Sequence, residues 1–244
     1  MFGSYNPGHL IEHKWENCFT IDKRSWAYRP IANIGDYMTI EEVVKEIVTT
    51  ISTGGNALVN VGPNMHGKIP PIYQERLQQM GSWLKVNGEG LYGSMPWLYQ
   101  NDTINSDVWY TSSKDSRYVY AFLLVWPKNT TDITLGAPLT SSNTVVTILG
   151  SNGDLLQWRV ADGNRGIVID VSNVKLHLLE SQWVWTFKLT NLVTDNITST
   201  TIDHTTSEHI TTRSSAAASF YSNLLFFMFL CQLCVTVFSS SYLL

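Results

Sequence analysis

The chain has 244 residues, enough for one large domain or two of ordinary size. Its 16 basic and 20 acidic side chains give a net charge of −4 with no basic cluster, which argues against a nucleic-acid partner. Nine Trp and eleven Tyr among few charged residues argue against a disordered chain and are typical of proteins that are secreted or handle sugars.

Three N-x-S/T sequons indicate N-glycosylation in the secretory pathway, and they begin at Asn101, Asn129 and Asn196. Residues 1–20 lack the basic and apolar regions of a signal peptide, since polar residues and Pro7 interrupt the stretch. A secretory composition without such a signal predicts that a further N-terminal part belongs to the protein.

The first clear element is an amphipathic helix over residues 39–52. Thr39 and Glu42 have the spacing of a capping box, and apolar residues recur at helical intervals between them and the end of the segment. The pair Gly54-Gly55 ends this helix. An apolar strand over residues 56–63 follows, typical of a strand buried on both faces of a parallel sheet.

A second helix is predicted from Pro70 to about Val86, with an inner face formed by Ile72, Leu77, Met80, Trp83 and Leu84. The order helix, strand, helix indicates a parallel α/β sheet or barrel. Because a closed eight-fold barrel takes about 250 residues, residues 1–90 are expected to be the C-terminal portion of one. Asn60, near the end of the strand, either faces a ligand or satisfies a turn backbone, and we favour the turn.

Residues 91–192 change to short β-branched and aromatic runs separated by turn residues. This pattern predicts an antiparallel β-sandwich domain. The expected strands lie at residues 108–111, 118–126, 144–149, 166–171 and 183–189.

The remaining residues do not fit a packed domain. Residues 193–219 are rich in Thr and Ser and are expected to form a disordered stalk. Residues 220–244 form an apolar tail, preceded by the small-residue run 214–218. The tail is interpreted as a cleaved lipid-anchor signal, with a membrane-spanning helix or an artefact of the gene model as alternatives, so a membrane tether is expected.

Glu16 is the main candidate for glycosidic chemistry because tryptophan lies beside it. Aromatic rings stack on sugar faces, and apolar surroundings raise the pKa of a carboxyl group toward that of a general acid. A second aromatic cluster, containing Trp26 and Tyr28, follows. Asp22 and Arg24 lie near enough in sequence to form a supporting ion pair, and a solvated charge cluster is the alternative. The alternative is that Glu16 is a surface or helix-capping residue.

A competing motif, His9-Leu-Ile-Glu-His13, matches the H-x-x-E-H pattern of one class of zinc peptidase. Such a motif has to lie on a helix, with a further acidic ligand downstream. Pro7-Gly8 before it and the absence of an amphipathic pattern disfavour that helix. We therefore expect no metal site.

Long collinear segments resemble the later half of animal α-L-fucosidases, glycoside hydrolase family 29, and most closely the secreted plasma-type branch. They are HKWENCFTIDKRSWAYR at residues 13–29, the helix that begins at Thr39, and residues 52–70, 75–97 and 107–112. The resemblance extends from about Tyr5 to Leu192.

The resemblance implies a (β/α) barrel followed by a β-sandwich, and a retaining hydrolase that removes terminal α-L-fucose from glycans without a metal or organic cofactor. It implies that Glu16 is the acid/base and that Trp26 and Tyr28 lie near the sugar. A fucosylated glycoprotein or glycolipid would be the substrate, and a lysosomal or extracellular location is expected.

The resemblance also implies that essential groups are missing. The family's nucleophilic aspartate and its fucose-binding histidines lie on earlier strands. A rival acid/base aspartate precedes Tyr5 in the family, where this chain has Met1 to Ser4. The 244 residues alone are therefore expected to be weakly active or inactive, as a truncated form. Partial barrels expose strand edges, so association between copies is also expected. The alternative function is a non-catalytic, surface-tethered glycan-binding protein derived from a fucosidase.

Overall fold

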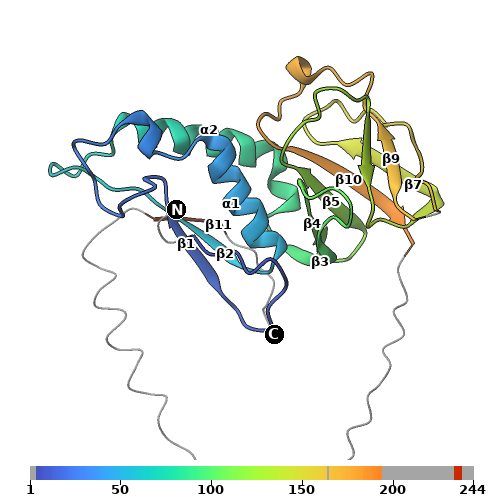
Figure 1. Ribbon diagram of the computed structural model, residues 1–244, viewed down its shortest axis with the longest axis horizontal. Coiled ribbons are helices and arrows are strands. Elements are labelled where there is room, and N and C mark those ends of the chain that lie inside the picture. Colours follow the sequence, from blue (N-terminus) through green and yellow to red (C-terminus); the bar gives the residue numbers. More distant parts are fainter. Residues whose placement is uncertain (1–3, 164, 194–233, 238–244) are drawn as a thin grey trace, which may run out of the picture. The chain divides into compact units, whose positions relative to one another are not determined.

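The computed structural model describes residues 4–163, 165–193 and 234–237. Two regions with separate kinds of sheet make up this part of the chain (Figure 1). The first region has a three-stranded sheet, in which two strands are parallel to each other and the third is antiparallel, and two α-helices. The second is antiparallel throughout. Among the described residues, no helix is both long enough and apolar enough to cross a membrane.

The parallel region starts with strand β1 (Glu16–Thr20) and strand β2 (Asn56–Asn60). The two pair in register, with Glu16 opposite Asn56 and Thr20 opposite Asn60. Helix α1 (Ile40–Ser52) connects them and packs along one face of the pair (Figure 1). Strand β1 was not expected from the sequence. It is only five residues long, and polar side chains occupy both of its faces.

Helix α1 begins as its sequence predicts. The hydroxyl of Thr39 accepts from the Glu42 backbone N–H at 3.3 Å, and the Glu42 carboxylate accepts from the Thr39 backbone N–H at 2.8 Å. This reciprocal cap satisfies two backbone donors that the first turn would otherwise leave without partners. The buried face of α1 includes Val43, Val44, Ile47, Val48 and Ile51.

The two faces of the strand pair differ in character. Phe19 packs into the same core as α1, and the Asn17 amide donates to the Thr50 hydroxyl of α1 at 2.8 Å. Side chains alternate along a strand, so the other face carries Glu16, Cys18 and Thr20 of β1 with Asn56, Leu58 and Asn60 of β2. The helix-covered face is mainly apolar, whereas the opposite face is largely polar.

A third strand, β11 (Cys234–Val237), pairs antiparallel with the other edge of β2. It comes from the segment that the sequence analysis interpreted as an apolar tail. The rest of that tail, and the stalk before it apart from Val193, lie outside the described residues. The anchor and the spanning helix therefore stay predictions.

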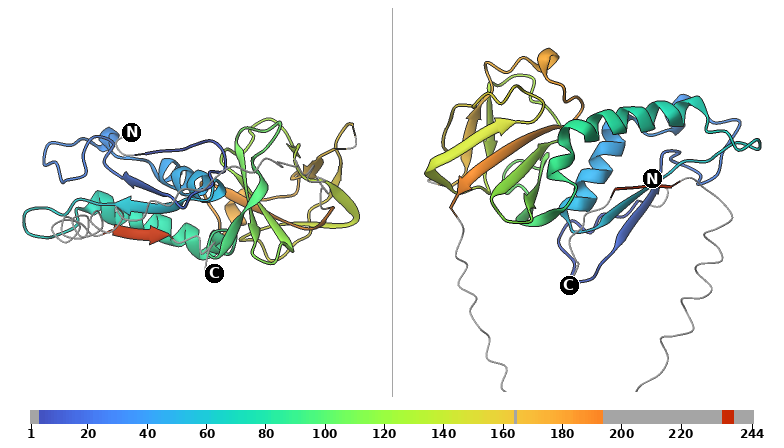
Figure 2. Two further views of the ribbon diagram at one scale, coloured as in Figure 1. Left: turned by 90° about the horizontal axis from the view of Figure 1, so that it is seen from below. Right: turned by 180° about the vertical axis from the view of Figure 1, so that it is seen from behind.

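Helix α2 (Pro71–Asn87) is the second predicted helix, and it leads directly to the antiparallel region through the short helix η2 (Gly88–Gly90) (Figure 2). Its buried face differs in part from the expected one. Ile72 and Leu77 are only partly buried, whereas Tyr73, Met80, Trp83, Leu84 and Asn87 are buried.

The antiparallel region consists of two sheets, as the sequence predicts. The larger sheet has the order β3-β4-β5-β10-β7 and the smaller one β6-β9-β8. The strands are β3 (Ser94–Asn101), β4 (Val108–Ser113), β5 (Tyr118–Leu123), β6 (Asp132–Leu135), β7 (Thr140–Ile148), β8 (Trp158–Val160), β9 (Ile167–Asp170) and β10 (Trp185–Leu192). Strands β3, β6 and β8 were not expected, because β3 contains Pro96 and the other two are short.

The two regions share a buried seam. The indole N–H of Trp83 donates to the Val184 carbonyl at 2.8 Å, and the ring lies 6.4 Å from that of Phe122. The Asn87 amide donates to the Ser181 hydroxyl at 2.9 Å, and its Oδ1 accepts from Thr186 at 2.7 Å. Because these polar groups are buried and satisfied across the seam, α2 is fixed to the sandwich.

Candidate functional site

The carboxyl ends of β1 and β2 are where parallel α/β enzymes place their ligands. At this end the chain leaves β1 through a loop from Ile21 to Arg29, which carries the predicted site residues Trp26 and Tyr28.

A buried ion pair closes the loop. The carboxylate of Asp22 is fully buried. It accepts hydrogen bonds from Nε and from one terminal nitrogen of the Arg29 guanidinium, each at 2.8 Å. It also accepts from the Arg24 backbone N–H at 2.9 Å. The side-chain hydrogen bonds from Arg29 to Asp22 and the charge of Asp22 raise the pKa of Arg29 above its usual value. A forked, charge-assisted pair fixes geometry better than a single contact.

The predicted ion pair between the side chains of Asp22 and Arg24 is therefore wrong, because only the backbone N–H of Arg24 contacts Asp22. The guanidinium of Arg24 instead lies 3.2 Å from the Asp36 carboxylate, while Arg29 fills the Asp22 site and approaches Asp36 at 3.4 Å. Asp36 accepts from the Asn33 backbone N–H, and this hydrogen bond, with the nearby guanidinium groups, lowers the pKa of its carboxyl group.

Asn60 holds the middle of the same loop from the end of β2. Its amide donates to the Trp26 carbonyl and to the Thr20 hydroxyl, both at 2.9 Å. This is the backbone-satisfying role that the sequence favoured. Its Oδ1 is buried and has no hydrogen-bond partner among the described residues. Gly62 allows the loop to approach, since a Cβ there would lie 2.5 Å from the Tyr28 nitrogen.

Trp26 and Tyr28 are half-buried on this loop, so the core does not enclose either residue completely. A half-exposed aromatic ring is suited to stacking on a sugar face. The structure thus brings the two predicted aromatic residues to the carboxyl end of the parallel strands, together with Asp22, Arg29 and Asn60.

Glu16 lies elsewhere. It is the first residue of β1, at the amino end of the strand pair, and its side chain is exposed on the largely polar face. Its carboxylate accepts from the Asn56 amide at 2.5 Å and from the Cys18 thiol at 3.3 Å. The acid/base role stays a prediction, and this position counts against it because catalytic groups of such folds gather at the opposite end.

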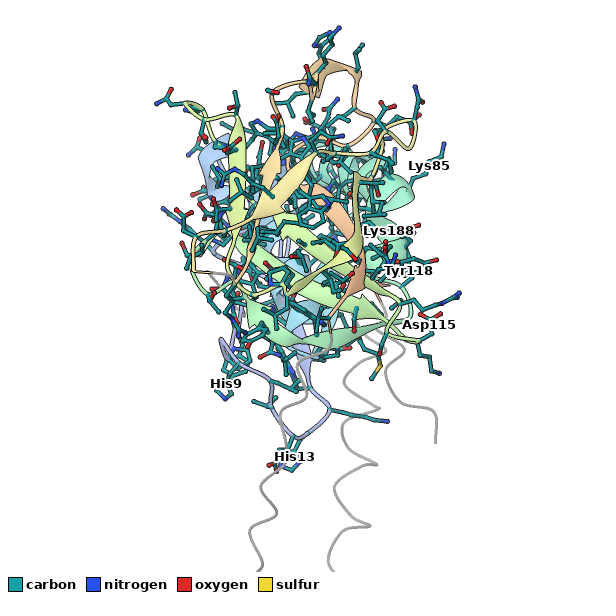
Figure 3. The ribbon with its side chains drawn as sticks, turned by 90° about the vertical axis from the view of Figure 1, so that its right-hand side faces the viewer. His9, His13, Lys85, Asp115, Tyr118 and Lys188 are labelled. Carbon is teal, nitrogen blue, oxygen red and sulfur yellow. The ribbon has the colours of Figure 1, made fainter. Side chains whose placement is uncertain are left out.

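The residues of the zinc-peptidase motif do not form a helix. His9 and His13 are exposed on an irregular loop, at separate positions in Figure 3. Among the described residues, no group of three or more His, Cys, Asp or Glu side chains could hold a metal ion.

The sandwich surface has different chemistry. A hollow of about 500 Å³ is lined by Ile148, Gly150, Ser151, Asn152, Asp154, Leu155, Leu156, Asn173, Val174, Lys175, Leu178, Leu179 and Glu180, and it contains no aromatic ring. Elsewhere Lys188 lies 4.1 Å from the centre of the Tyr118 ring and pairs with Glu89 at 2.9 Å (Figure 3). Lys188 is thus held by contacts within the protein.

The family profile named Alpha-L-fucosidase matches residues 1–89, and the profile named Alpha-L-fucosidase C-terminal domain matches residues 100–190. The chain therefore belongs to the α-L-fucosidase family, glycoside hydrolase family 29.

Its relatives include plasma and tissue enzymes. The plasma alpha-L-fucosidase of Rattus norvegicus is 51% identical over 189 residues, which make up 77% of this chain and 40% of the relative. The plasma alpha-L-fucosidase of Homo sapiens is 48% identical, covering 78% and 40%. The human tissue alpha-L-fucosidase is 42% identical over 188 residues, covering 77% and 39%. The chain thus spans about 40% of the length of these relatives.

Solved structures of α-L-fucosidases have a similar fold. The alpha-fucosidase of Thermotoga maritima in complex with a mechanism-based inhibitor has a TM-score of 0.64 and 25% identity, over 77% of this chain and 42% of that one. Alpha-L-fucosidase isoenzyme 1 of Paenibacillus thiaminolyticus has a TM-score of 0.63 and 24% identity, over 78% and 44%.

Two features of the site escaped sequence reasoning. The partnership of Asp22 with Arg29 joins the two ends of a loop, so it depends on how the loop closes. The end of the strand at which Glu16 lies could not be judged, because β1 was not predicted. No sequence motif relates Arg29 to Asp22, so the sequence carries no signal for their ion pair.

Proposed function

We propose that this chain is part of an α-L-fucosidase, which hydrolyses terminal α-L-fucose from glycoproteins or glycolipids with retention of configuration. The observation that carries the proposal is the collinear match to α-L-fucosidases through both regions, at 48–51% identity to the plasma enzymes. Fucosylated glycans are the substrates, and the plasma and tissue relatives favour an extracellular or lysosomal location.

We further propose that the parallel region is the final portion of a (β/α)₈ barrel. Helix α1 covers the outer face of the β1–β2 pair, while the opposite face carries mainly polar side chains. In a closed barrel that second face would be the interior. A membrane tether through residues 220–244 remains a proposal that the fold does not support, because Cys234–Val237 of that segment pairs with β2.

In such an enzyme, one carboxylate attacks the anomeric carbon, and a second group protonates the leaving oxygen and then activates water. We assign the loop from Ile21 to Arg29 to substrate binding. Trp26 and Tyr28 supply apolar ring faces, and Asp22, Arg29 and Asn60 fix the loop that carries them. Preorganisation of this kind lowers the cost of binding, because the loop does not have to be ordered by the sugar.

The experiment that tests the proposal is a chimaera. Residues 5–192 replace the matching segment of the rat plasma alpha-L-fucosidase, and hydrolysis of an aryl α-L-fucoside is measured beside the parent enzyme. We expect turnover within about tenfold of the parent, a change of about 1.4 kcal/mol in activation free energy. A chimaera that has the parent's circular dichroism and melting temperature but no turnover would contradict the proposal.

The 244 residues alone provide a complementary test. We expect the purified polypeptide to show weak or no turnover of the same substrate, since the chemistry takes two carboxyl groups and the family's nucleophile belongs to an earlier strand. Hydrolysis at the rate of the parent enzyme would refute the assignment of the nucleophile to that earlier strand.

A further inference from the structure

We infer that the outer edge of β2, opposite the edge that pairs with β1, is an acceptor site for an extended strand, and that residues Cys234–Val237 of the same chain fill it as an edge cap. The structure places β11 at this edge in a defined register. By filling the edge, the segment keeps the parallel region from pairing with a second copy of the chain. The edge cap concerns the sheet alone and does not depend on fucosidase activity.

Strand β2 takes a partner on each of its two edges. Ala57, Val59 and Asn60 are fully buried, and Leu58 is nearly so. A backbone N–H or C=O group that is buried without a partner costs free energy comparable to a lost hydrogen bond. Among the described residues only β1 and β11 pair with β2, and β1 takes one edge. The backbone groups of the other edge therefore depend on β11.

Strand β11 matches this edge over most of the length of β2. The register runs without a shift from Cys234 opposite Asn60 to Val237 opposite Ala57, and so covers four of the five residues of β2. Three of the four residues of β11 are Val or Thr, β-branched types that favour strands. Figure 2 shows β11, in red, alongside β2.

An open edge of this kind is a site of association between chains. Natural proteins protect edge strands with charged residues, Pro or bulges, or they cover the edge with another element. The sequence of β2, Asn-Ala-Leu-Val-Asn, contains no charged residue and no Pro, and its pairing with β1 shows no bulge. Covering is therefore the protection that remains, and β11 provides it within one chain.

The direction of β11 shows that it is a substitute for a barrel strand. It runs antiparallel to β2, whereas β1 and β2 are parallel. In the closed barrel proposed above, this edge of β2 would belong to a further parallel strand. The edge cap and barrel closure therefore exclude each other, a consequence that rests on the proposed function. The chimaera takes only residues 5–192 and lacks β11, so its turnover tests that function without the cap.

Pairs of introduced cysteines test the register in the full chain, after the three native cysteines have been replaced by Ser. Val59→Cys with Val235→Cys places two thiols directly opposite each other. Val59→Cys with Val237→Cys is the control, because its positions are two residues out of register and too far apart for a disulfide. We expect mild oxidation to form the 59–235 disulfide within single chains and to leave the control reduced. A disulfide that forms only between chains, or none, would overturn the inference.

Val235→Pro combined with Thr236→Pro tests the protective role. Adjacent residues of a strand direct their N–H groups to opposite edges, so the two changes remove a donor that faces β2. We expect the unaltered chain to sediment with the mass of one chain and the double variant to form dimers or larger species. Ser239→Pro with Ser240→Pro is the matched control and should sediment like the unaltered chain. A double variant that stays monomeric and keeps the circular dichroism of the unaltered chain would overturn the inference.

Discussion

The sandwich and the parallel region differ in how completely they bury their own sheets. The sandwich encloses a core between its two sheets, with buried residues such as Val108, Tyr110, Ile133, Ile167 and Phe187. The parallel strand pair is covered by helix on one face and presents largely polar side chains on the other. The self-contained region thus serves as a scaffold, whereas the parallel region carries the candidate site.

The seam between the regions explains how the parallel region is supported. The core that includes α1 and α2 continues into Tyr120, Phe122, Leu124 and Val184 of the sandwich. Helix α2 contributes both apolar packing and buried polar contacts to this seam. The parallel region therefore gains part of its stability from the sandwich, and the two are expected to unfold together.

Trp83→Ala is expected to have the largest effect on stability. Loss of a fully buried indole at the seam should lower the free energy of unfolding by about 4 kcal/mol. Urea unfolding of the 244-residue chain, followed by near-ultraviolet circular dichroism, measures it. Trp83→Phe, which keeps a ring but loses the hydrogen bond to Val184, should cost less. Two separated transitions in the unaltered chain would show that the regions do not support one another.

Tyr110→Phe tests the sandwich alone. Burial, the charge of Asp102 and the hydrogen bond to that carboxylate raise the pKa of Tyr110, so its hydroxyl stays protonated and donates. Removing the hydroxyl takes one donor from a buried carboxylate and should cost about 2 kcal/mol. The same measurement on Tyr92→Phe, at an exposed position, is the control and should show no change. Equal effects of the two variants would contradict the structural role of Asp102.

The smallest expected effect on stability concerns Asp36 and the dependence of the melting temperature on acid pH. The backbone N–H of Asn33 and the nearby arginines hold the pKa of Asp36 below its ordinary value of 3.8. A depressed pKa stabilises the fold above the unfolded value and loses that contribution as the pH falls through the folded value. The difference in melting temperature between the unaltered chain and Asp36→Asn should therefore shrink from pH 6 to pH 3.

A matched variant extends this test to the sandwich. The hydroxyl and backbone N–H of Ser172 lower the pKa of Asp170, so Asp170→Asn should behave in the same way. If both variants shift a single melting transition, the two regions unfold as one unit. A pH-independent difference for either variant would show that its carboxylate is not stabilised in the folded state.

Much of the fold is predictable from the sequence, for identifiable reasons. The capping box at Thr39 and the helical period that follows define α1, and the apolar run after Gly55 defines β2. Strand β1 was missed because its residues show no clear alternation, and β3 because Pro96 is unfavourable in a strand.

Residues of the candidate site could be predicted where the prediction depended only on the type of residue. Trp26 and Tyr28 were identified from their aromatic rings, and the structure places both at the carboxyl end of the parallel strands. The Asp22–Arg29 pair was not, because it forms only when the loop closes. The residue type and its tryptophan neighbour were enough to propose Glu16 as a catalytic group. Only the structure shows that Glu16 lies at the amino end of β1.

The most direct test compares the two ends of β1 in the chimaera with the rat enzyme. We expect Trp26→Ala to lower kcat/KM for an aryl α-L-fucoside by about tenfold or more, and Glu16→Gln to change it by less than about threefold. The melting temperature of each variant controls for folding. Loss of about a hundredfold or more in Glu16→Gln, with altered pH dependence and an unaffected Trp26→Ala, would place the chemistry at the amino end and contradict this account.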